Sequence, residues 1–192
     1  YSSVYSKFAK KVICFDSDKK LIENLKKNKI NINEPGLKKK FLLNKKKIIF
    51  TSKFEDLEKS KLIFVSKDIA TDSEGNSNYN EINNICNSII KLKSKDSAII
   101  FLSQLKPGFT KNFNYKIKNQ VYYQVETLIF GEAINRALNP ERFIIGSKSG
   151  KIINKNYLKL LDKFKCPILN MNYQSAEFSK IAINLFLISS TM

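Results

Sequence analysis

One carboxylate of the chain is placed where it could bind a nucleotide. Asp16 directly follows Val12–Phe15, an apolar run that favours a strand, and residues 18–27 then carry the apolar spacing of a helix. A carboxylate at this point of a dinucleotide-binding fold accepts hydrogen bonds from the ribose hydroxyls and repels a 2′-phosphate, which favours NAD over NADP. The sequence is equally compatible with Asp16 or Asp18 simply capping the helix.

The glycine-rich turn that should precede such a carboxylate is not found in residues 1–11, which contain no glycine. This segment is similar to the helix that follows such a turn. We therefore expect the first strand and the phosphate-binding GxGxxG turn to lie upstream of residue 1.

The elements that must position this carboxylate alternate along the chain. Strands are predicted at residues 12–15, 48–51, 62–65, 98–102, 121–125, 143–145 and 167–170, and helices at 18–27, 54–59, 81–92, 153–164 and 175–189, with a polar loop at 71–80. This order predicts an α/β fold, a Rossmann-like, doubly wound and mainly parallel sheet with helices on both faces.

Such a sheet binds its ligands at the carboxyl ends of the strands. The polar residues that follow the predicted strands are therefore the candidates for a site. They are Asp16, residues 66–71, residues 103–108 and the segment from Glu126 onward.

Four segments carry a resemblance to a known family. Residues 34–37 read EPGL, and residues 103–110, SQLKPGFT, are similar to S-T-V-x-P-G-T-T. Residues 126–146 resemble E-F-L-R-E-G-x-A followed by P-x-R-x-x-I-G, and residues 175–187 resemble A-E-x-x-K-x-x-x-N-x-F-L. Together, in this order and at these distances, they resemble the UDP-glucose and GDP-mannose dehydrogenase family over nearly the whole chain.

The resemblance implies a reaction. Members oxidise C6 of a nucleotide-linked sugar from alcohol to carboxylate with two NAD and a cysteine thiol that holds the aldehyde stage. UDP-glucose, oxidised to UDP-glucuronate for polysaccharide precursors, is the default UDP-sugar substrate, and a UDP-N-acetylhexosamine is the alternative. Cys14, Cys86 and Cys166 do not lie in the motif of that cysteine, which we expect downstream of residue 192. The chain alone should therefore not complete the reaction.

The resemblance also assigns site residues. Lys180 and Asn184, one helical turn apart, would stabilise an oxyanion at C6, and Glu126 would act as a general base for thioester hydrolysis. The alternatives are a surface lysine for Lys180 and a sheet-edge carboxylate for Glu126. The implied cofactor-binding residues are Asp16, Ile69, Ala70, Ser103 and Gln104; the implied substrate-binding residues are Glu126, Thr127, Leu128, Ile129, Phe130, Lys180 and Asn184.

Five residues in three segments depart from the family pattern. A threonine–proline pair is replaced by Ile69-Ala70, a threonine by Gln104, and an arginine–glutamate pair by Ile129-Phe130. These changes bear on the nicotinamide contacts and the sugar preference. They favour a divergent branch of the family, with a catalytically inactive dinucleotide-binding module as the competing hypothesis.

The formal net charge of +17 raises the possibility of a nucleic-acid partner. Only Arg136 and Arg142 could supply the bidentate guanidinium groups that specific readers of bases use. The lysines are spread along the chain beside many Asn and Ile residues, which indicates compositional drift. We therefore expect no nucleic-acid partner.

Other partners follow from composition and from the resemblance. No apolar run is long enough for a membrane span, and the absence of histidine excludes a histidine-dependent triad or metal site, so we expect neither a membrane nor a metal. Three widely spaced cysteines indicate buried thiols in a reducing, cytoplasmic compartment.

The resemblance divides the chain at residue 172. Residues 1–172 would form the NAD-binding domain, and residues 173–192 would begin a central helix through which the intact protein forms a homodimer. As given, this helix should leave Leu185, Phe186, Leu187 and Ile188 exposed.

Overall fold

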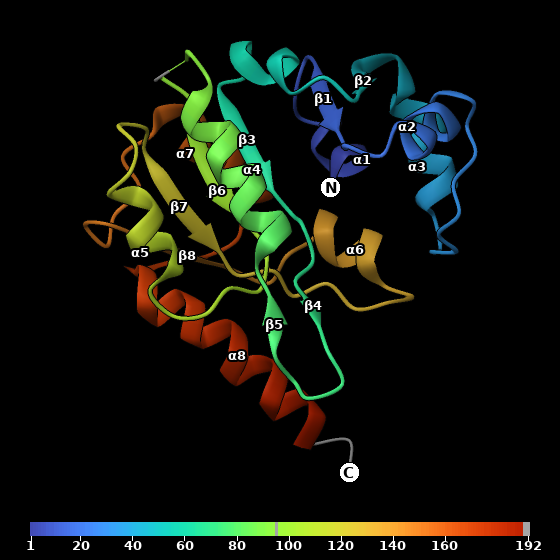
Figure 1. Ribbon diagram of the computed structural model, residues 1–192. Helices are drawn as coiled ribbons and strands as arrows, with labels where there is room; N and C mark the ends of the chain where they lie inside the picture. Colours follow the sequence, from blue (N-terminus) through green and yellow to red (C-terminus); the bar gives the residue numbers. More distant parts are fainter. Residues whose placement is uncertain (95, 190–192) are drawn as a thin grey trace.

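The computed structural model describes residues 1–94 and 96–189, without the side chain of Ile188. Its largest sheet has five strands in the order β3-β6-β7-β8-β9, and β1 and β2 form a separate parallel pair (Figure 1). The bounds of these strands are β1 Val12–Phe15, β2 Ile48–Thr51, β3 Leu62–Val65, β6 Ala98–Phe101, β7 Val121–Gln124, β8 Phe143–Ser147 and β9 Ile168–Asn172.

Strand direction changes once in the five-stranded sheet. Strands β3, β6 and β7 are parallel to one another, β8 is antiparallel to β7, and β9 is parallel to β8. The predicted α/β fold with a mainly parallel sheet is confirmed. The carboxyl ends of β3, β6 and β7 consequently meet at one edge.

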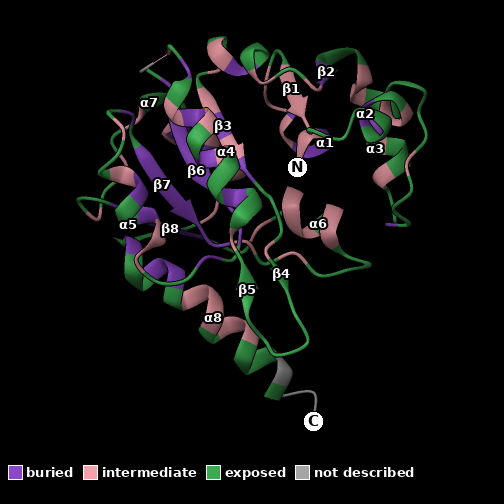
Figure 2. Ribbon diagram, in the orientation of Figure 1, coloured by how far each residue is buried: buried purple, intermediate pink, exposed green. Residues whose placement is uncertain are grey.

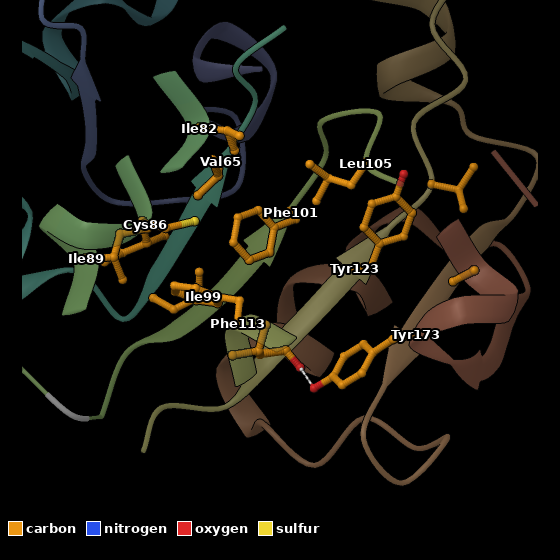
Figure 3. Close-up of a cluster of buried hydrophobic side chains, with 14 of the residues drawn as sticks. Val65, Ile82, Cys86, Ile89, Ile99, Phe101, Leu105, Phe113, Tyr123 and Tyr173 are labelled. Carbon is orange, nitrogen blue, oxygen red and sulfur yellow. Dashed lines mark hydrogen bonds between the residues drawn. The ribbon is translucent and has the colours of Figure 1, made fainter. Parts of the chain in front are cut away.

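Helices cover both faces of this sheet, and every residue of its central strands β6, β7 and β8 is buried. On one face Ile99 and Phe101 pack against α4 (Asn80–Lys91), α5 (Phe109–Asn114) and α8 (Tyr173–Ser189); Figure 3 shows this cluster. On the other face Ala98 and Ile100 pack against α7 (Lys155–Leu161), which continues into the 3-10 turn η3 (Asp162–Phe164). Figure 2 shows the buried strands between these exposed helix surfaces. Successive residues of β6 therefore pack on opposite faces of the sheet, as expected for a strand that is buried on both faces.

The β1–β2 pair has a small core of its own. Ile22 of α2 (Lys19–Lys26) and Phe41 of α3 (Leu37–Asn44) pack against Ile48 and Phe50 of β2. The 3-10 turns η1 (Lys45–Lys47) and η2 (Phe54–Lys59) precede and follow β2, and the single-turn helix α1 (Ser2–Tyr5) contacts β1 and α3.

Three helices and one hairpin were not predicted. The helices are α3, α5 and α6 (Ala133–Leu138), and the hairpin pairs β4 (Ala70–Thr71) with β5 (Ser77–Asn78) at the predicted polar loop. Gly36 and Gly108 begin α3 and α5 with backbone φ of 77° and 95°, which glycine adopts without strain. Helices α5 and α6 have six residues each, too few turns for an apolar period to stand out.

The cysteine prediction holds for one residue of three. Cys86 is buried on the inner face of α4, whereas Cys14 and Cys166 are only half-buried, and all three are free thiols. Burial raises the pKa of Cys86 to about 12. At neutral pH this thiol is therefore un-ionised and behaves as a small core residue.

The last helix has the exposure that the sequence predicts. Leu185, Phe186 and Leu187 are exposed by 62%, 71% and 44%. The side chain of Ile188 lies outside the described residues. Within residues 1–94 and 96–189, no helix has the length and apolar character to cross a membrane.

We predict that Gly146 sets the distance between α8 and β8. A Cβ atom at Gly146 would lie 2.8 Å from the Ala176 Cβ and 3.1 Å from the Tyr173 Cα, closer than packed carbon atoms approach. Gly146→Ala should lower the free energy of unfolding, measured in urea, by about 1–3 kcal/mol.

A double-mutant cycle with Ala176→Gly provides the control. Removing the Ala176 methyl group relieves the shortest contact, so the double variant should be more stable than the two single changes predict by addition. Simple additivity would show that these residues do not meet.

Candidate functional site

The strand-end residues predicted from sequence meet on one side of α8. The Lys180 ammonium donates a hydrogen bond to the backbone carbonyl of Glu126, which follows β7. One turn on, the Asn184 Nδ2 donates to the Gln104 Oε1, in the loop after β6, at 2.8 Å. The structure therefore brings together four of the predicted residues from three segments, at the edge where parallel strands end.

Lys180 occupies an electrostatically unusual position. Its side chain is half-buried, and this desolvation lowers its pKa, while the carboxylates of Glu126 and Asp68 oppose the shift. Asp68, in the loop after β3, lies within residues 66–71, which the sequence indicated as a candidate segment without assigning a role to Asp68. A desolvated ammonium that faces carboxylates is suited to stabilising negative charge or to moving a proton.

The loop that begins at Glu126 leads away from this site. The Glu126 carboxylate accepts a hydrogen bond from the Leu128 N–H, which folds the loop back on itself. Thr127 and Ile129 are exposed, and Phe130 is 88% exposed. The structure thus brings Glu126 to Lys180, whereas the side chain of Phe130 makes little contact with the described part of the chain.

Asp16 and Asp18 have different roles. The Asp18 Oδ1 accepts from the Leu21 N–H at 3.0 Å and caps α2. The Asp16 Oδ1 accepts from the Asp18 N–H at 2.9 Å, so Asp16 is not the cap of this helix. Asp16 directly follows β1 and carries a carboxylate, whose oxygens are the acceptors that the hydroxyl groups of a ribose diol require.

The other cofactor candidates lie at the ends of β3 and β6. Ser103 is buried, and its hydroxyl donates to the Val65 carbonyl at 3.5 Å, so this side chain joins the two strand ends. Ile69 packs against the larger core cluster, and Ala70 is exposed in β4. Gln104 faces Asn184 of α8, and Asp16 lies in the separate β1–β2 sheet.

A buried glutamate joins two of the family-like segments. Glu177, with no exposed surface, accepts hydrogen bonds from the Gly108 N–H at 2.5 Å and the Thr110 N–H at 2.8 Å. These N–H groups open α5, where backbone donors have no partner within the helix. Glu177 thus fastens α8 to the loop after β6, three residues before Lys180.

A second buried glutamate repeats this arrangement. Glu34 accepts from the Gly131 N–H and the Ala133 N–H, both at 2.8 Å, and thereby caps α6. It joins the EPGL segment to the end of the loop that begins at Glu126. Sequence reasoning noted both glutamates inside motifs and missed their role; the signal was a glycine one or two residues before each short helix.

The fold is a Rossmann-like α/β domain with polar side chains gathered where its parallel strands end. Residues 1–164 match the UDP-glucose/GDP-mannose dehydrogenase family, NAD binding domain. The chain belongs to this family, and its cofactor is NAD.

Similar proteins include a UDP-glucose 6-dehydrogenase from Campylobacter jejuni, 28% identical over 92% of this chain and 46% of that protein. A UDP-glucose 6-dehydrogenase from Bacillus subtilis is 27% identical over 92% of this chain and 42% of its own length. The chain therefore spans about half the length of these relatives.

Solved structures share the fold. A GDP-mannose dehydrogenase from Pseudomonas aeruginosa superimposes with a TM-score of 0.88 over 99% of this chain and 47% of its own, at 18% identity. A UDP-glucose dehydrogenase from Pyrobaculum islandicum superimposes with a TM-score of 0.87 over 97% of this chain and 46% of its own, at 19% identity.

We predict that Glu177 supports the fold through its two hydrogen bonds. Glu177→Leu fills a similar volume but leaves the N–H groups of Gly108 and Thr110 without an acceptor. The free energy of unfolding should fall by about 1–3 kcal/mol in urea titrations. An unchanged stability would contradict this role.

The pH dependence of stability provides a control. Burial raises the pKa of Glu177 above the ordinary 4.5, although hydrogen bonds from Thr110 and Gly108 oppose the shift. The folded protein then holds this proton more tightly than the unfolded chain, so the Glu177 contribution to stability falls as pH rises from 4.5 through the raised pKa. Glu177→Gln, which stays neutral, should lack this part of the pH dependence.

Proposed function

We propose that the whole protein oxidises C6 of a UDP-sugar with NAD, by default UDP-glucose to UDP-glucuronate. The observation that carries the proposal is the position of Lys180, half-buried beside Glu126 and Asp68 and joined to the loop after β7. The UDP-glucose 6-dehydrogenases among its relatives support this choice of substrate class.

The residues of this chain would act by binding, by charge and by proton transfer. Asp16 would accept hydrogen bonds from a ribose of NAD, and Ser103 and Gln104 lie beyond β6 where the same ligand would extend. Bound NAD supplies the acceptor for the hydride that leaves C6. Glu126 would orient or deprotonate water.

Lys180 would hold the substrate oxygen. Its ammonium donates to the Glu126 carbonyl and keeps further N–H donors, since an ammonium carries three. The Asn184 Nδ2 donates a hydrogen bond to the Gln104 Oε1, so the Asn184 Oδ1 remains as an acceptor for a sugar hydroxyl. Together they would bind the alcohol and stabilise negative charge that develops on its oxygen.

The decisive experiment measures NADH formation by the protein expressed from its complete reading frame. UDP-glucose is compared with UDP-N-acetylmannosamine, the alternative substrate class, at equal concentration. Faster turnover of UDP-glucose supports the proposal. NAD binding without turnover of either sugar would instead identify an inactive dinucleotide-binding module.

We predict that substitutions of Asp16 and of Asp18 affect the affinity for NAD differently. Asp16→Asn removes a charged acceptor and should weaken NAD binding about 10- to 100-fold in calorimetric titrations of the complete protein. Asp18→Asn is the matched control, because asparagine also caps helices and α2 keeps its first turn. Equal losses in both variants would show that the effect is structural.

We also predict a large loss of turnover on changing Lys180. Lys180→Met keeps the length and apolar part of the side chain but removes the ammonium, so kcat should fall about 100- to 1,000-fold. Lys159→Met, on the exposed side of α7, is the control and should leave kcat unchanged. A Lys180→Met enzyme with normal kcat would refute the assignment.

A further inference from the structure

The positive charge is concentrated in one part of the molecule, contrary to the expectation from the sequence. Residues 1–53 contain 15 lysines and four carboxylates, and no carboxylate interrupts residues 35–54, which hold seven lysines. Of these four carboxylates, Glu34 is buried against Gly131 and Ala133, and Asp18 caps α2. The β1–β2 pair with α2 and α3 therefore forms a strongly basic lobe (Figure 1).

Helix α3 presents two different faces. Phe41 is buried and packs against Phe50 with tilted rings whose centroids are 5.6 Å apart, so the helix is fixed with one side inward. The opposite side of α3, extended by one residue of η1, carries five exposed residues, here named the basic-leucine face. Its members are Lys38, Lys39, Leu42, Leu43 and Lys46.

The two leucines of this face are unusually exposed for their type. Leu42 is 48% and Leu43 is 69% exposed, although Phe41 beside them is buried. Lysine ammonium groups flank them on both sides along the helix. Of the neighbouring lysines, Lys45 and Lys47 donate to backbone carbonyls of Lys26 and Ser6, which leaves the lysines of the basic-leucine face directed outward.

This combination matches a particular partner. A surface for phosphate alone gains from lysines, but it gains nothing from leucines that project between them. The interface of an anionic bilayer offers lipid phosphates to the ammonium groups and hydrocarbon to the leucines within a few ångströms. Lysine stems can lie along the apolar boundary while their charged ends remain at headgroup level.

We propose that the basic-leucine face of α3 binds the surface of membranes that contain anionic lipids. The contact is peripheral, and the described residues include no membrane-crossing helix. The sequence prediction of no membrane partner was based on the lack of an apolar span, which a peripheral contact does not need. The proposal does not rest on the proposed oxidation, since none of its five residues is proposed to bind NAD or the sugar.

The test is co-sedimentation of vesicles with the protein expressed from its complete reading frame. Phosphatidylglycerol–phosphatidylcholine vesicles should bind the protein at low salt, pure phosphatidylcholine vesicles should not, and added salt should weaken binding. The variant Lys38→Gln/Lys39→Gln/Lys46→Gln should bind about 10- to 100-fold more weakly. The matched control Lys155→Gln/Lys159→Gln/Lys163→Gln removes the same charge from α7 and η3 and should change affinity less than about threefold.

A second variant tests the leucines. Leu42→Ser/Leu43→Ser keeps every charge and should lose about tenfold or more in vesicle affinity, because it removes the apolar contact. Thermal unfolding of each variant confirms that exposed substitutions leave the fold intact. Deoxyoligonucleotide binding and sedimentation velocity are measured in parallel.

Three outcomes would overturn the proposal. The first is equal loss in the α3 and α7 triple variants, which indicates net charge alone. The second is vesicle binding unaffected by the leucine substitutions together with tighter oligonucleotide binding, which indicates a nucleic-acid surface. The third is no vesicle binding with a dimer that the leucine substitutions dissociate, which indicates a second copy of the chain.

Discussion

Two buried glutamates satisfy the opening N–H groups of two short helices, and the arrangement of the site depends on them. Helices α5 and α6 have six residues each, too short to form stably by local propensity alone. Glu177 and Glu34 give each helix a fixed first turn by supplying an acceptor from a distant segment. Each carboxylate accepts two backbone hydrogen bonds, so its loss would leave buried donors unsatisfied.

Helix α8 gathers these contacts on one face. Glu177, Lys180 and Asn184 are three and four residues apart, the spacing that places side chains above one another along a helix. They contact the start of α5, the end of β7 and the loop after β6. The structural glutamate therefore sets the position of the two residues proposed for chemistry, and Gly146 allows the helix to approach β8 closely enough for all three.

The residues proposed for chemistry, Lys180 and Glu126, lie away from the proposed membrane contact on α3, although Asp16, proposed for NAD binding, belongs to the same β1–β2 lobe as α3. The carboxyl edge of the five-stranded sheet concentrates carboxylates around one half-buried lysine. The β1–β2 lobe concentrates exposed lysines around two leucines. Segregating the two kinds of charge keeps an anionic surface away from the carboxylates that a sugar-binding site needs.

The strands, the family-like segments and the mainly parallel sheet were predictable from sequence, because apolar runs such as residues 98–101 and motifs such as EPGL are local features. The short helices α3, α5 and α6 were not, since their stability comes from contacts rather than from periodicity. The sequence left ribose binding by Asp16 and helix capping by Asp16 or Asp18 as equal alternatives, and the hydrogen bonds identify Asp18 as the cap of α2. The pairing of Glu177 with Thr110 and of Glu34 with Ala133 joins residues 67 and 99 positions apart. No local pattern encodes such a distance, because the packing of the whole chain decides which unsatisfied N–H groups meet which carboxylate.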